Sequence, residues 1–290
     1  MTGVARRVDA WLFADGPAGR LAALRAGLAV ILLLRIATWP FVELAGAPPS
    51  LFRPPLLLAW AQGMPPAPVL AALQVAGVGG AVVAVAGSWR GWRGTAAGLR
   101  VGWFALLVLG GFKTSTGKIL HNDVLLLLVA FPAVLASARA RIGDRRPGSG
   151  FGWPVRVGLT VLSLVYLLSG VQKLRHSGLA WVFSDNMRWI LHDAIGSGMA
   201  PTTAVATALM GSALLSTLAS LGLLAFELVI PVALVWRRAR LAMAFGAVTL
   251  HSLTWLTLGL DYWAWSLVAA LVLGLSGWPR PGSPPARPAG

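Results

Sequence analysis

The chain has 290 residues, of which 57% are hydrophobic and only 11% are charged. Soluble domains are about a quarter charged, so this composition argues against a water-soluble globular protein and indicates lipid as the solvent. Cysteine is absent, which excludes disulfides, thiolate metal sites and a cysteine nucleophile. The formal net charge is +15, yet the arginines lie in short clusters between apolar runs, as the positive-inside rule expects, so we expect no nucleic-acid partner.

Apolar runs recur along the chain without a long polar interval, which predicts a single transmembrane domain over residues 1–278. A helix needs ~20 apolar residues to cross the hydrocarbon core, and about eight segments are candidates. The candidate spans are Leu21–Gly46, Pro68–Gly87, Ala96–Phe112, His121–Ala138, Val155–Lys173, Thr207–Trp236, Ala239–Leu260 and Tyr262–Trp278. The predicted fold class is therefore an all-α, polytopic transmembrane helical bundle surrounded by a lipid bilayer.

Charge placement orients this bundle. Arginines cluster before the first span and between the second and third, the fourth and fifth, and the sixth and seventh spans. These clusters belong in the cytoplasm, and an even number of spans puts both termini there. We expect a multi-pass protein of the plasma (inner) membrane, with an amphipathic lead-in at the N-terminus and a disordered, proline-rich cytoplasmic tail over residues 279–290.

The segment after the fifth span, RHSGLAWVFSDNMRWILHDAIGSGM, lies on the outer side. It predicts a short amphipathic helix from about Ser184, an N-cap candidate, to Ile195. Trp181 and Trp189 suit the headgroup level, where aromatic rings are enriched. This segment is placed to roof whatever lies between the helices.

Ionisable residues inside a bundle are functional candidates by default, because burying them is costly. Lys173 ends the fifth span within YLLSGVQKL and is either a general base or a lysine that snorkels to the headgroups. His121 opens the fourth span in ILHNDVLLLL and is either a polar interfacial residue or one that handles protons. Asp123 does not share a helix face with His121, so we expect it to cap the helix instead.

Two further candidates lie deeper in the sixth and seventh spans. Glu227 precedes Pro231 by four residues in LLAFELVIPVAL, and a carboxylate at that depth needs a partner or a proton. His251 lies in VTLHSLTWLTLGL and is either a packed hydrogen-bonding residue or a second proton carrier.

Two arginines of the first span, Arg25 and Arg35, lie ten residues apart, and we expect both to point the same way. We expect Arg25 to snorkel to the cytoplasm. Arg35 is deeper and should pair with a carboxylate, either Glu43 or Glu227. No phosphate loop, HExxH pair or GxSxG elbow is present, and no two histidines have i, i+4 spacing, so we predict no metal site.

This arrangement resembles the HTTM family, the membrane domain shared with the vitamin K-dependent γ-carboxylases. The resemblance covers nearly the whole chain. It rests on LLLRIATWPF, GKILHNDVLLL, YLLSGVQKL followed by GLAW, FELVIP and a histidine-bearing seventh span. The YLLSGVQKL element followed by a tryptophan is more specific than the others.

The resemblance implies a vitamin K-like quinol bound in an outer-facing cavity. In the carboxylases the lysine of the matching element is the base that deprotonates the quinol, so Lys173 would take that role and His121 would match a histidine of the quinol pocket. We place Trp181 beside the quinol with His121. The expected proton-relay or pocket residues are His251, Glu227 and Arg35.

Two departures shape the functional hypotheses. Gln172 stands where the carboxylases have a second lysine, and the chain ends soon after its last span, so we expect peptide carboxylation to need a separate extra-membrane partner protein. The first hypothesis is a quinol-dependent, carboxylase-like oxidase or epoxidase with a lysine base. The alternative is a non-enzymatic membrane subunit or a proton-coupled transporter in which Glu227 beside Pro231 forms a gate.

Overall fold

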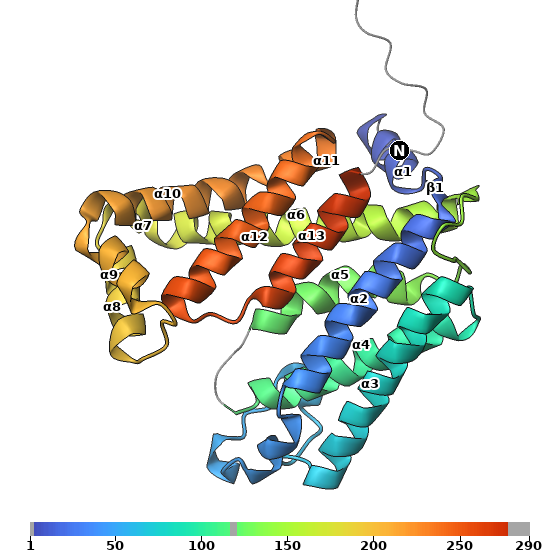
Figure 1. The fold of residues 1–290 in the computed structure, drawn as a ribbon, viewed down its shortest axis with the longest axis horizontal. Helices are drawn as coiled ribbons and strands as arrows, with labels where there is room; N and C mark the ends of the chain where they lie inside the picture. Colours follow the sequence, from blue (N-terminus) through green and yellow to red (C-terminus); the bar gives the residue numbers. More distant parts are fainter. Residues whose placement is uncertain (1–2, 117–120, 278–290) are drawn as a thin grey trace, which may run out of the picture.

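The computed structural model describes residues 3–116 and 121–277, apart from the side chain of His121. Within these residues the regular structure is almost entirely helical (Figure 1). The α-helices are α1 Gly3–Leu12, α2 Ala18–Thr38, α3 Ala67–Arg90, α4 Gly94–Thr114, α5 Val124–Leu135, α6 Ser149–Ser177, α7 Ala180–Phe183, α8 Asn186–Gly196, α9 Thr203–Gly211, α10 Ala213–Val229, α11 Val232–Val235, α12 Ala239–Leu258 and α13 Trp263–Gly277. The 3-10 helices are η1 Phe41–Gly46, η2 Pro49–Leu51, η3 Leu56–Leu58 and η4 His121–Asp123.

Six helical segments of the described chain are long and apolar enough to cross a membrane, judged by length and composition. They are α2, α3, α4, α6, α12 and the segment Ala213–Val235, which joins α10 to α11. Two shorter apolar helices, α5 and most of α13, accompany them. Large apolar side chains such as Val75, Leu241 and Phe245 are exposed on these helices, as lipid contact requires. The predicted all-α helical membrane bundle is confirmed.

Proline and serine set helix boundaries that differ from the predicted spans. The first span ends at Thr38 instead of Gly46, because the residue before Pro40 is disfavoured in a helix. The predicted sixth span is divided at two points. Ser212 caps α10 by accepting a hydrogen bond from the backbone amide of Leu215 at 3.3 Å, and Pro231, which lacks an N–H, separates α10 from α11.

The predicted fourth span is the 12-residue helix α5, and its end is held by a buried arginine. Arg25 is only 1% exposed. Its guanidinium donates hydrogen bonds to the carbonyls of Ala133, Ala136 and Ala138, with the Ala138 bond at 2.8 Å. The expectation that Arg25 snorkels is therefore wrong, because the carbonyls at the end of α5 lack helical donors and offer a partner inside the protein.

Small residues allow the closest helix contact, between α3 and α4. A β-carbon built on Gly98 would lie 2.6 Å from the carbonyl oxygen of Gly80, so only glycine permits this approach. Helix α2 packs against α13, and α6 crosses both α2 and α13 (Figure 1). The main core lies where these helices meet, around Leu28, Leu32 and Val268.

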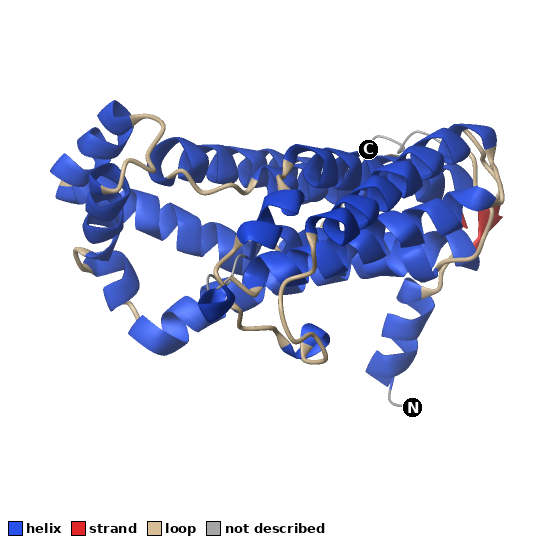
Figure 2. Cartoon of the chain, turned by 90° about the horizontal axis from the view of Figure 1, so that it is seen from below, coloured by secondary structure: helices blue, strands red, loops and turns tan. Residues whose placement is uncertain are grey.

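A pair of two-residue strands ties the N-terminal segment to the start of α6. Strands β1 Gly16–Pro17 and β2 Pro147–Gly148 pair antiparallel, with Gly16 opposite Gly148. Figure 2 shows the N-terminal helix α1 projecting from this end of the bundle. The expected lead-in is thus a helix, and it lies at the end that carries the arginine clusters around Arg20, Arg145 and Arg237. We call this end the arginine-rich end.

Candidate functional site

A cavity of about 380 Å³ lies between α6, α10 and α12, away from the arginine-rich end. Helices α7, α8 and α13 and the α12–α13 turn complete its walls. Its lining consists of Tyr166, Ser169, Lys173, Trp181, Met187, Ile190, Leu223, Glu227, Leu250, His251, Thr254, Leu258, Leu260, Tyr262 and Trp265. We call it the Lys173 cavity. It brings together four residues singled out from the sequence: Lys173, Glu227, His251 and Trp181.

Lys173 and Glu227 form an ion pair at this cavity. The Lys173 ammonium donates to Glu227 Oε1 at 2.6 Å and to Oε2 at 2.7 Å. The Ser169 hydroxyl accepts from Lys173 at 3.0 Å and donates to Glu227 Oε1 at 3.0 Å. The Glu227 side chain is 9% exposed and that of Lys173 is 22% exposed. Lys173 is therefore neither a freely snorkelling lysine nor an isolated base, because a carboxylate holds its ammonium inside the bundle.

The sequence of α6 places this chemistry on one helix face. Tyr166, Ser169 and Lys173 are three and four residues apart, which is one face of an α-helix. Gly170 lies beside them at the contact with α10. A β-carbon built on Gly170 would lie 3.0 Å from Leu228 Cδ2 and 3.1 Å from Glu227 Cβ. Glycine at this position thus lets α10 approach closely enough for Glu227 to reach Lys173.

Proline supplies a second local feature beside Glu227. In an uninterrupted helix the amide of residue 231 would donate to the carbonyl of Glu227, but Pro231 has no N–H. The helix resumes only at Val232 as α11. The predicted interruption one turn beyond Glu227 is confirmed.

His251 belongs to an aromatic cluster that also lines the cavity. Its Nε2 shares a hydrogen bond of 2.6 Å with the buried hydroxyl of Tyr166. The Tyr166 ring lies edge-on to Trp265 at 5.9 Å, and the His251 ring lies 5.5 Å from Tyr262. His251 is 9% exposed, so it is a hydrogen-bonded residue of the cavity wall whose ring is positioned by its neighbours.

Tyr262 precedes α13 in the short turn after α12. Gly259 begins this turn with φ +66°, which ends α12 in the left-handed conformation that glycine favours. Burial raises the pKa of the Tyr262 phenol above its usual value, so this wall of the cavity carries a protonated hydroxyl at neutral pH.

The segment predicted to roof the bundle does cover the cavity. Helix α8, Asn186–Gly196, overlaps the predicted helix, but its N-cap position is Asp185 and not the expected Ser184. It contributes Met187 and Ile190 to the lining. Trp181 in α7 is partly buried, and the Lys173 ammonium lies 5.3 Å from the centre of its ring, within the range of a cation–π contact.

Arg35 lies in a separate buried charge cluster and does not line the cavity. It forms ion pairs with Asp123 and with Asp261, the latter at 2.5 Å. Lys113, 3% exposed, lies 3.8 Å from the second oxygen of Asp123. The predicted pairing of Arg35 with Glu43 or Glu227 is therefore wrong. Helix α2 packs against α5 and α13. Asp123 lies in η4 directly before α5 and Asp261 lies in the turn before α13, whereas Glu227 is engaged by Lys173.

Asp123 occupies the expected N-cap position of α5, but its side chain makes no capping hydrogen bond. It serves as the partner of Arg35 instead, because a buried guanidinium is costlier to leave unpaired than a helix amide. The backbone of His121 lies in η4, while its side chain lies outside the described part of the chain. Its proposed proton-handling or quinol-contacting role stays a prediction. The predicted disordered cytoplasmic tail over residues 279–290 also lies outside the described residues and stays a prediction.

Sequence reasoning missed Tyr166, Ser169 and Asp261 as site residues. Helical spacing could have identified the first two, since both lie on the same face of the predicted fifth span as Lys173. Asp261 was the only carboxylate of its inter-span turn, which marked it as a candidate partner for a buried cation. Lys113 carried no signal beyond its place at the end of a span.

No protein-family model, curated protein or solved structure matches the chain. Among the described residues, no group of three or more histidine, aspartate or glutamate side chains is arranged to hold a metal ion.

Proposed function

We propose that the Lys173 cavity binds a lipid-soluble ring that bears an ionisable hydroxyl, such as a quinol, and that Lys173 accepts its proton. The observation that carries this proposal is the Lys173–Glu227 pair at the edge of a cavity whose other walls are mainly aromatic and aliphatic. Small-molecule sites typically combine roughly 300–1,000 Å³ of apolar space with a few placed polar groups. A volume of about 380 Å³ suits a ring compound of modest size.

The lining offers both recognition elements that such a ligand needs. Trp181, Tyr262 and Trp265 present aromatic surfaces against which a flat ring can pack. The ion pair lies at the polar part of the lining, where a ring hydroxyl would form charge-assisted hydrogen bonds. A quinol of the vitamin K type fits this donor set, and when bound it would supply the electrons for a reaction with oxygen.

Proton transfer within the pair explains how a paired lysine can act as a base. The proton that Lys173 shares with Glu227 needs to move only across the 2.6 Å hydrogen bond to Oε1, which leaves a neutral amine and a protonated carboxyl. Both charges disappear together, so a desolvated site penalises this neutral state less than water does. The amine then takes the hydroxyl proton of the ligand, and Glu227 retains the first proton.

The Tyr166–His251 pair borders the same cavity. It would accept the proton of the second hydroxyl of the quinol. The HTTM resemblance supports this division of roles, since YLLSGVQKL contains Tyr166, Ser169 and Lys173. Within this proposal the cavity opens toward the outer side of the plasma membrane, as the arginine distribution favours.

The direct test uses purified protein in liposomes with the naphthoquinol menadiol as the probe. We expect protein-dependent oxygen uptake above that of empty liposomes, and its loss in Lys173→Ala. Arg175→Ala is the matched control, because Arg175 is an exposed cation two residues further along α6 and does not line the cavity. The double variant Lys173→Met with Glu227→Leu removes both charges without leaving one unpaired and therefore guards against simple unfolding.

Two results would overturn the proposal. One is a wild-type protein that neither consumes oxygen with menadiol nor retains menadione in native mass spectrometry. The other is equal activity in Lys173→Ala and Arg175→Ala, since the cavity lysine would then have no special role.

The helix interruption at Pro231 favours one second candidate function, a proton-coupled transporter. A carboxylate one turn before a break in a spanning helix is a device found in ion-coupled transporters, and Glu227 has this position. Proton-dependent flux in proteoliposomes that is lost in Glu227→Gln, without any quinol oxidation, would support the transporter over the enzyme.

A further inference from the structure

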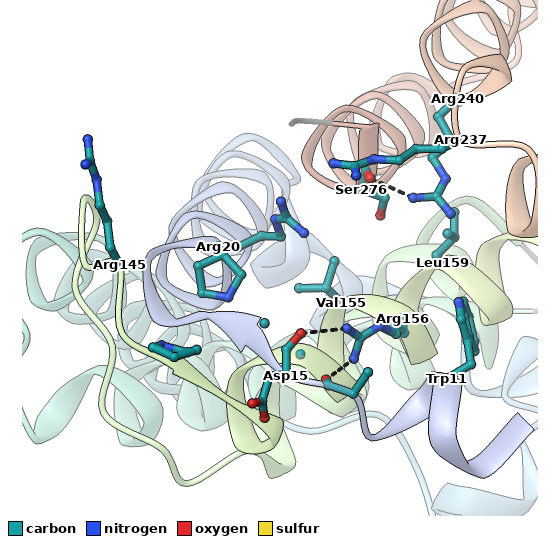
Figure 3. Close-up of a pocket in the computed structure, with 15 residues that line it drawn as sticks. Trp11, Asp15, Arg20, Arg145, Val155, Arg156, Leu159, Arg237, Arg240 and Ser276 are labelled. Carbon is teal, nitrogen blue, oxygen red and sulfur yellow. Dashed lines mark hydrogen bonds between the residues drawn. The ribbon is translucent and has the colours of Figure 1, made fainter. Parts of the chain in front are cut away.

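A second and larger cavity, of about 680 Å³, lies at the arginine-rich end of the bundle. Arginines from four separate parts of the chain line it: Arg20 of α2, Arg145 before β2, Arg156 of α6, and Arg237 and Arg240 at the start of α12. The only carboxylate among the lining residues is Asp15. Figure 3 shows the Asp15 carboxylate pointing away from Arg20 and Arg237. We call this space the arginine cavity.

Two of these arginines hold the walls of the cavity together. Arg156 donates to the carbonyls of Leu12 at 3.1 Å and Asp15 at 2.9 Å, which fixes the end of α1 against α6. Arg240 donates to the carbonyl of Ala233 at 2.7 Å and to that of Ser276 at 2.6 Å. These acceptors are neutral, so each bond satisfies a donor without cancelling the positive charge that the arginine brings to the cavity.

Arg20 and Arg237 line the same space, whereas the Arg145 side chain extends away from the other arginines (Figure 3). In Figure 3 the guanidinium groups of Arg20 and Arg237 lie on the same side of the cavity as that of Arg240. Charges of one sign in a hollow with low-dielectric walls focus the electrostatic potential and attract counter-ions. Planar guanidinium groups also match the geometry of phosphate oxygens, to which they donate paired hydrogen bonds.

The requirement for cytoplasmic positive charge does not by itself explain this convergence. That requirement is met by arginines in any loop on the proper side, and Arg6, Arg90, Arg93 and Arg238 lie at the same end without lining the cavity. Five arginines around one hollow repel one another, and the requirement for cytoplasmic positive charge does not call for this arrangement. A bound anion would relieve that repulsion.

Apart from Asp15 and Ser276, the rest of the lining is apolar, as an amphiphilic ligand would need. Trp11, Val155 and Leu159 contribute to the walls. Helix α1, which borders the cavity, exposes Val4 and Val8, as expected of a helix lying in the membrane interface. From the charge, the hollow shape and this interfacial position we infer that the arginine cavity binds a phosphate group, carried either by an anionic phospholipid or by a water-soluble phosphate ester.

Native mass spectrometry of the detergent-purified protein tests this inference with three probes: dioctanoyl phosphatidylglycerol, dioctanoyl phosphatidylcholine and glycerol phosphate. We expect phosphatidylglycerol to bind at least about tenfold more tightly than the zwitterionic phosphatidylcholine, and Arg20→Gln and Arg237→Gln each to weaken it about tenfold. Arg238→Gln is the matched control. It removes the same charge from the neighbouring position, outside the lining, and should change affinity less than about twofold.

The two phosphate sources are separated by the third probe. Glycerol phosphate that binds as tightly as phosphatidylglycerol, with the same dependence on Arg20 and Arg237, identifies a water-soluble ligand. Tight binding of phosphatidylglycerol alone identifies a lipid. Equal affinity for the two lipids in the wild type, or equal losses in Arg237→Gln and Arg238→Gln, overturns the inference. Thermal unfolding of each variant verifies that the arginine substitutions leave the bundle folded.

Discussion

The ammonium of Lys173 lies 2.6 Å and 2.7 Å from the two carboxylate oxygens of Glu227, 54 positions further along the chain. This contact joins α6 to α10 and gives the Lys173 cavity its polar edge. A paired lysine can act as a base only after its proton has moved to its partner, here Glu227.

Removing one member of the pair should destabilise the protein more than removing both. Lys173→Met leaves Glu227 buried without a cation, at a cost of about 1–3 kcal/mol once partial exposure of the pair is allowed for. Adding Glu227→Leu should recover most of this loss, because an apolar pair leaves no charge to be solvated. Thermal unfolding in detergent measures the cycle. A double variant as unstable as the sum of the singles would show that the two side chains are not coupled.

Gly170→Ala should weaken the site without touching any charged group. The new methyl would lie 3.0 Å from Leu228 Cδ2 and 3.1 Å from Glu227 Cβ, so these two side chains must shift by a few tenths of an ångström, at a cost of about 1–3 kcal/mol. Menadiol oxidation should fall with it. Gly222→Ala on α10 is the control, since a β-carbon there meets nothing within 4 Å, and it should be neutral or slightly stabilising. Equal stability of the two variants would contradict the close packing of α6 on α10.

Arg35→Met should be among the most damaging single substitutions. It leaves Asp123 buried with only Lys113 at 3.8 Å nearby and releases Asp261, which we expect to cost about 3–5 kcal/mol. Arg35→Lys should recover little, because an ammonium cannot bridge two carboxylates as the guanidinium fork does. Arg53→Met, in an exposed position of the loop after α2, is the control. Unfolding temperatures and detergent-extracted yield compare the three variants, and similar values for Arg35→Met and Arg53→Met would refute a structural role for the cluster.

Tyr166→Phe isolates the hydrogen bond to His251. The substitution retains the ring and its edge-on contact with Trp265 but removes the hydroxyl that lies 2.6 Å from His251 Nε2. A buried nitrogen left unpaired costs about 1–3 kcal/mol. Tyr262→Phe, the same change at the only other tyrosine of the chain, should cost less, because Tyr262 is only partly buried. The difference in unfolding free energy between the two variants measures the bond, and a difference near zero would argue against it.

Hydropathy and residue spacing determined the helical architecture. Apolar runs predicted each of the hydrophobic helices, since a backbone in lipid must satisfy its own hydrogen bonds. Helical periodicity is sufficient to place Tyr166 and Ser169 on the face of Lys173, although neither was predicted as a site residue, and the proline at 231 predicted the interruption beyond Glu227. These features depend on residues near one another in the chain, so local rules suffice to derive them.

Only the tertiary structure decided which buried charges meet. Arg25 and Arg35 are ten residues apart, which is about 2.8 helical turns, so the expectation that both point the same way is wrong. The first binds the carbonyls that end α5 and the second binds Asp123 and Asp261. Lys173 pairs with Glu227, which the sequence analysis had named as one of two possible partners of Arg35. Such pairings depend on the neighbours that each helix acquires and on close contacts like that at Gly170, and spacing along one helix carries no information about either.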